Sequence, residues 1–62
     1  MSLHLFKRIQ GDNWEDLGQP DILLTYLDFG FTGEELIDDL KQLATVVTAF
    51  QGLEFEVREI PE

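Results

Sequence analysis

The sequence predicts a single small α+β domain, a two-layer fold in which two strands flank two helices. Three observations indicate this class. Apolar and polar residues alternate near both ends of the chain, which is typical of strands, and apolar residues recur at three- and four-residue steps between them, which is typical of helices. Apolar residues make up 44% of the 62 residues, enough for a packed core despite the high charge. We therefore expect one domain, residues 1–62, in β-α-α-β order.

The first strand is expected at residues 3–9. Its odd-numbered positions are mostly apolar and share one face, while His4, Phe6 and Arg8 share the other. Residues 10–19 are expected to form a loop, because two glycines and the Asp12-Asn13 pair favour turns.

Residues 20–29 admit two interpretations. As a helix, the segment begins at Pro20, gathers Ile22, Leu23, Tyr26 and Leu27 on one stripe, and ends at a left-handed Gly30. As a strand over 22–29, it would give a β-β-α-β order with a three-stranded sheet and one long helix. The helix is preferred, because the strand would leave both of its faces apolar.

Residues 33–50 carry the clearest helical pattern. Thr32 and Glu35 form a Thr-x-x-Glu capping box ahead of it. Apolar residues then recur from Leu36 to Phe50 at helical spacing, and Gly52 follows as the stop. Residues 53–60 alternate again and are expected to form the second strand, paired with the first.

The charge of the chain limits its partners. Thirteen acidic residues against four basic ones give a net charge of −9, which argues against direct nucleic-acid binding, since that requires lysine and arginine. No apolar run is long enough to span a membrane. The first residues do not have the pattern of a signal peptide, so a cytoplasmic location is expected.

The residues needed for catalysis or metal binding are scarce. The chain has no cysteine and one histidine, His4. The sets of residues usually needed for nucleophilic catalysis and for zinc binding are therefore incomplete. The acids around Trp14 do not have the alternation of a calcium loop, because Trp14 occupies a ligand position. We therefore expect no enzyme activity, no cofactor and no metal site.

The acids themselves are the candidate partner-binding residues. Glu34, Glu35, Asp38 and Asp39 lie on the first turns of the long helix, and Asp12, Glu15 and Asp16 form a second candidate patch. The first hypothesis is a non-catalytic interaction module, regulator or inhibitor that docks on a basic protein surface through these acids. The close spacing of the helix acids also suggests a second hypothesis, in which they mimic the charges of a nucleic acid. The alternative is a small structural subunit or homodimer that associates through an apolar sheet edge.

Overall fold

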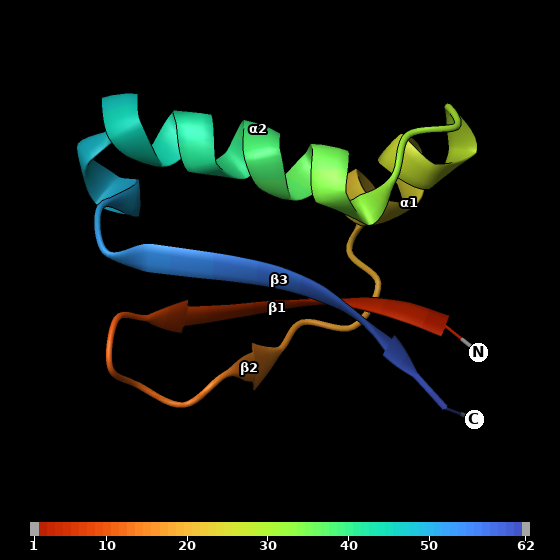
Figure 1. Ribbon diagram of the computed structural model, residues 1–62, viewed down its shortest axis with the longest axis horizontal. Coiled ribbons are helices and arrows are strands. Elements are labelled where there is room, and N and C mark those ends of the chain that lie inside the picture. Colours follow the sequence, from red (N-terminus) through yellow and green to blue (C-terminus); the bar gives the residue numbers. More distant parts are fainter. Residues whose placement is uncertain (1, 62) are drawn as a thin grey trace.

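The computed structural model describes residues 2–61 and has the predicted α+β class. Strand β1 (Ser2–Ile9), strand β2 (Glu15–Asp16) and strand β3 (Leu53–Ile60) form an antiparallel sheet in the order β2-β1-β3. Helix α1 (Asp21–Asp28), helix α2 (Gly33–Val46) and a 3₁₀ turn (Thr48–Phe50) lie between β2 and β3 in the chain. Both helices cover the same face of the sheet (Figure 1).

The sheet has three strands, so the two-stranded sheet of the preferred β-α-α-β order is wrong. The alternative order was right about a second strand before the helices, but that strand lies at residues 15–16, inside the predicted loop. Residues 21–28 are helical, as preferred. The short strand forms because the Leu5 N–H donates to Gly18 O at 2.9 Å and the Leu17 N–H donates to Leu5 O at 2.8 Å. These bonds satisfy the side of β1 that β3 leaves open.

The long pairing of β1 with β3 sets which residues face the helices. Its register runs from Ser2 opposite Ile60 to Ile9 opposite Leu53. Leu5 and its neighbour Val57 face the helices and join the core. Because side chains alternate along a strand, the even-numbered residues of both strands lie on the outer face.

Helix α1 ends as the sequence predicts. Gly30 adopts a φ of 85°, and the Phe31 N–H donates to Tyr26 O at 2.9 Å. This is the closing bond of a left-handed helix terminus, which glycine adopts without strain. It turns Phe31 back onto Tyr26, with 5.6 Å between the ring centroids.

Helix α2 begins at the predicted cap and ends earlier than predicted. The Glu35 N–H donates to Thr32 Oγ1 at 3.2 Å, and the Thr32 N–H donates to Glu35 Oε2 at 2.8 Å, so the capping box is formed. The helix stops at Val46 instead of residue 50. The β-branched run that starts at Thr45 has low helix propensity, and Val47 is already extended.

The core lies between the sheet and the helices. Its most buried residues are Leu5, Leu23, Leu36 and Leu40, of which Leu23 and Leu36 are fully buried. The helical layer lies close to the sheet at Gly33, where an added Cβ would lie 2.8 Å from Val57 Cγ1. Helix α2 is therefore seated directly on β3. Within residues 2–61, no helix has the length and apolar character needed to cross a membrane.

Candidate functional site

The outer face of the sheet pairs its cations with acids. Arg8 donates from Nη2 to Glu54 Oε2 on the neighbouring strand at 2.9 Å. Arg58 donates from Nη2 to Glu56 Oε2 at 2.8 Å. This hydrogen bond lowers the pKa of Glu56. Both arginines are thus engaged within the molecule.

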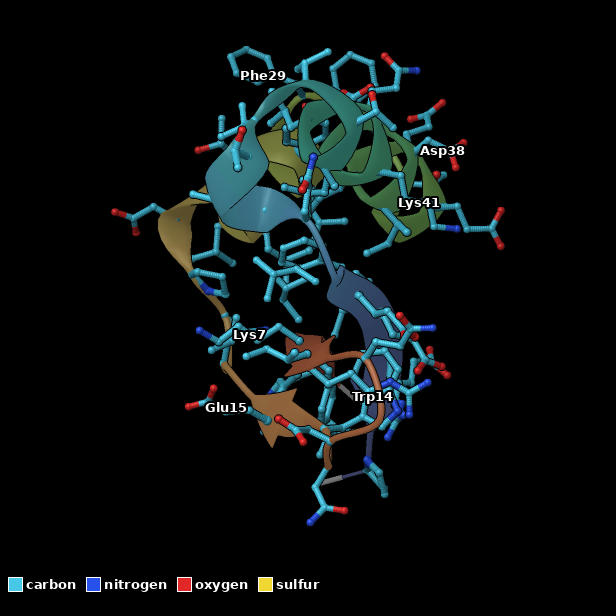
Figure 2. All side chains as sticks on the ribbon, turned by 90° about the vertical axis from the view of Figure 1, so that its left-hand side faces the viewer. Lys7, Trp14, Glu15, Phe29, Asp38 and Lys41 are labelled. Carbon is cyan, nitrogen blue, oxygen red and sulfur yellow. The ribbon has the colours of Figure 1, made fainter. Side chains whose placement is uncertain are left out.

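Trp14 covers the same outer face. The Arg8 guanidinium carbon lies 4.4 Å from the Trp14 ring centroid, and that of Arg58 lies 5.2 Å from it. Arg58 also lies 4.8 Å from the Phe6 ring centroid. These stacked contacts leave Phe6 only 9% exposed on a face that has no helices. Trp14 (Figure 2) therefore completes a small second core and is not a free aromatic patch.

The three acids of the second predicted patch, Asp12, Glu15 and Asp16, make different contacts in the structure. Glu15 Oε2 lies 3.7 Å from Lys7 Nζ, and the two lie on the same side of the molecule in Figure 2. Asp16 Oδ1 accepts from the Gly18 N–H at 2.7 Å and lies 3.0 Å from His4 Nδ1. The bond from Gly18, followed by that from His4, lowers the pKa of Asp16. Asp12 is exposed in the turn after β1, where its backbone N–H donates to Ile9 O at 2.8 Å.

Two of the four predicted helix acids are also engaged. Glu35 closes the capping box at Thr32. Asp39 Oδ2 accepts from the Tyr26 hydroxyl at 2.6 Å, which ties α2 to α1. This hydrogen bond raises the pKa of Tyr26, because ionising the phenol would remove the donor beside a carboxylate. Both acids therefore contribute to the local structure of the helical layer.

The other two predicted acids, Glu34 and Asp38, line an open groove between α2 and β3. The groove also includes Ile37 and Lys41 from α2 and Phe55 and Val57 from β3. Figure 2 shows Asp38 and Lys41 on the side of the molecule opposite to Lys7 and Glu15. Within the part of the chain that the structure describes, neither the Glu34 nor the Asp38 carboxylate takes part in a hydrogen bond or an ion pair. The groove was not predicted from the sequence, although the positions of Ile37 and Lys41 beside these acids on one helix indicated a shared face.

The two layers differ in charge. The helices carry six acids, Asp21, Asp28, Glu34, Glu35, Asp38 and Asp39, against the single base Lys41, which leaves them a net charge of −5. The three strands carry five acids against Lys7, Arg8 and Arg58, which leaves −2. The uncompensated charge of the molecule is therefore concentrated on the helices.

The helical layer also exposes apolar side chains. Phe29 is 77% exposed and Val46 is 76% exposed, while Phe31 and Leu43 are about half exposed. Phe29 projects from the outer side of the layer in Figure 2. The helices therefore present both acids and apolar groups to solvent.

Neither a search for metal-binding side chains nor comparison with known proteins assigns a function to this chain. Among residues 2–61, no group of three or more His, Cys, Asp or Glu side chains is arranged to hold a metal ion. Comparison with family models, curated proteins and solved structures finds no match to this chain.

Proposed function

We propose that the protein is a non-catalytic interaction module that docks on a basic protein surface through α2. The observation that carries this proposal is the unequal pairing of charge. Lys7, Arg8 and Arg58 all pair with acids of the sheet, whereas Glu34 and Asp38 of α2 have no cation partner among residues 2–61. Exposed charge of one sign steers and orients a partner of the opposite sign.

The arrangement of the acids favours a protein partner over nucleic-acid mimicry. Glu34 and Asp38 lie four residues apart on one side of α2, so their charges are separated by about 6 Å along the axis. Duplex DNA carries one charge per roughly 1.7 Å. Asp39 lies on the α1 side of the helix, where it binds Tyr26. A discrete pair of lysine or arginine side chains on the partner suits this spacing. We expect this partner to be a cytoplasmic protein.

The test is capture of basic proteins by the immobilised protein from the soluble fraction of a native lysate. The α2 variant carries Glu34→Lys and Asp38→Lys, and the matched control carries Asp12→Lys and Asp28→Lys. Each reversal changes the net charge by two, so both variants carry −5 instead of −9. We expect the α2 variant to lose the captured proteins and the control to keep them.

Salt gives the second arm of the same experiment. Ion pairing at an exposed surface weakens as the Debye length falls to about 3 Å near 1 M salt. We expect capture by the wild-type chain to decline with added sodium chloride. Capture that is insensitive to salt and equal for both variants would reject docking through α2 and would favour association through apolar groups.

A further inference from the structure

Strand β3 has a free edge along its whole length. It pairs with β1 on one side, and no strand lies on its other side within the described residues. The Gln10 N–H donates to Gly52 O at 2.9 Å, just beyond the end of the ladder. Bonded and non-bonded pairs alternate in an antiparallel ladder, so the even-numbered residues of β3 bond to β1. The outward N–H and C=O groups are therefore those of Leu53, Phe55, Val57 and Glu59.

Helix α2 forms a wall beside this edge. The same groove that holds Glu34 and Asp38 is lined on the sheet side by Phe55 and Val57. Gly33 lies against Val57, so the first turn of α2 sits directly over the strand. An incoming strand at the β3 edge would thus find backbone partners on one side and the α2 side chains above it.

The charge of the groove selects the occupant. Its charged lining residues on α2 are Glu34 and Asp38 against Lys41, a net charge of −1, and the remaining one, Glu56, is paired with Arg58. The floor is apolar at Ile37, Phe55 and Val57. Basic side chains that face α2 complement both features, because their alkyl stems cover the apolar floor while their charged ends reach the acids. Alternate side chains of a strand point to opposite faces, so the segment alternates basic and apolar residues.

The spacing of strands and helices favours a single extended segment over a second copy of this chain as the occupant of the β3 edge. Two copies joined antiparallel through β3 would place their α2 helices over neighbouring strands, about 4.8 Å apart. Packed helices require roughly 8–10 Å between axes. A single extended segment that carries no helix meets no such obstacle.

We propose that the groove between α2 and β3 binds an extended basic peptide segment as a fourth strand of the sheet. This inference rests on the proposed function and names the form in which the basic partner is bound. Residues of the segment opposite Phe55 and Val57 face α2 and are lysine or arginine, whose charged ends reach Glu34 and Asp38. The residue opposite Glu56 lies on the outer face and is apolar. The main chain supplies affinity and these side chains supply selectivity, as in other cases of strand addition.

The direct test is amide hydrogen exchange by NMR with the full chain and a synthetic peptide, Thr-Lys-Val-Lys-Val-Lys-Thr. In the free protein, the Phe55 and Val57 amides should exchange faster than the neighbouring Glu54 and Glu56 amides, which bond to β1. With saturating peptide, exchange at Phe55 and Val57 should slow by roughly tenfold or more. Exchange at these two amides that does not change on binding would overturn the strand-addition proposal.

A matched pair of variants tests the edge without relying on a destabilised core. Glu59→Pro removes an outward N–H and leaves the bonds to β1 in place, as proline is tolerated on an edge strand. Glu59→Thr makes the same change in charge and keeps the N–H. We expect Glu59→Pro to bind the peptide roughly tenfold more weakly than Glu59→Thr. Equal affinities in two folded variants would contradict the proposal.

The remaining outcomes separate this inference from the proposed function. Peptide binding that is lost in the Glu34→Lys and Asp38→Lys variant, but that leaves the Phe55 and Val57 amides unprotected, overturns strand addition and leaves docking on α2 intact. Binding that survives the α2 variant and its control alike overturns both. Protection of the same amides on raising the protein concentration alone, without peptide, overturns the peptide as occupant and identifies a second copy.

Discussion

The outer face of the sheet and the helical layer use charge in different ways. On the sheet, Arg8 and Arg58 pair with Glu54 and Glu56 and stack on aromatic rings. On α2, Glu34 and Asp38 face solvent with no cation partner among the described residues. Both regions are rich in acids, so the number of acids alone does not distinguish them. The difference teaches that the position of the few cations decides which acids support the fold and which are left for a partner.

The largest expected effect comes from removing the aromatic cover of the sheet. Trp14→Ala should lower the free energy of unfolding by about 2 kcal/mol, because it uncovers Phe6 and removes the stacking surface of Arg8. A domain of this size is expected to have only roughly 3–5 kcal/mol in total. Urea denaturation measures the loss, and Trp14→Phe should retain most of the stability. A loss no greater than that of an exposed residue would show that the outer face is not a second core.

The junction between the two regions is the next to test. Gly33→Ala should cost about 1–2 kcal/mol, because its Cβ would lie 2.8 Å from Val57 Cγ1. In a Val57→Ala background, the same Gly33→Ala change should cost less, since the opposing methyl groups are gone and only the Cβ, 3.0 Å away, remains. Denaturation of the single and double variants measures this coupling. Equal costs in both backgrounds would mean that α2 shifts freely over β3.

The helical layer depends on its cap. Thr32→Ala should lower stability by about 1 kcal/mol, because it removes the acceptor for the Glu35 N–H. Thr32→Ser keeps that acceptor and should be close to wild type in thermal or urea unfolding. A loss below about 0.3 kcal/mol for the alanine variant would show that the capping box contributes little to α2.

Acid titration sharpens the comparison through Asp16. Hydrogen bonds from Gly18 and His4 lower its pKa in the folded chain, so its contribution to stability is present above the unfolded pKa of about 4 and is lost as pH falls through the folded value. Asp16→Asn keeps an acceptor for the Gly18 N–H and does not titrate. Urea midpoints measured on both sides of pH 4 should therefore fall less for Asp16→Asn than for wild type. Parallel curves would mean that the lowered pKa has no effect on folding.

The predictable parts of the fold were those determined by local sequence. The capping box at Thr32 and Glu35, the left-handed Gly30 and the alternating strands at both ends follow from spacing and backbone preference. The end of α2 at Val46 was missed, because the apolar pattern continues to Phe50 while the β-branched run ends the helix. Strand β2 was missed because two residues have too little pattern to detect.

The candidate site was less predictable than the fold, for a physical reason. Glu34, Glu35, Asp38 and Asp39 look equivalent in the sequence, but the direction of each side chain on α2 decides its neighbours. Asp39 meets Tyr26 of α1, and Asp38 faces the groove beside β3. Which acids remain unpaired therefore depends on how α2 is rotated over the sheet, and packing between distant segments sets that rotation.

The most direct test neutralises two acids in each region and measures both stability and binding. The sheet variant carries Glu15→Gln and Glu54→Gln, and the α2 variant carries Glu34→Gln and Asp38→Asn. Each substitution removes one negative charge, so both variants carry −7 instead of −9. Stability is measured by urea denaturation, and affinity is measured for the Thr-Lys-Val-Lys-Val-Lys-Thr peptide at low salt.

The division of charge between the two regions predicts opposite results for these variants. The sheet variant should lose about 0.5–1 kcal/mol of stability and keep its affinity for the peptide. The α2 variant should lose affinity and only the about 0.3 kcal/mol that an exposed acid contributes in the first turn of a helix. A sheet variant that binds more weakly than the α2 variant, or two variants with the same stability and the same affinity, would contradict the account.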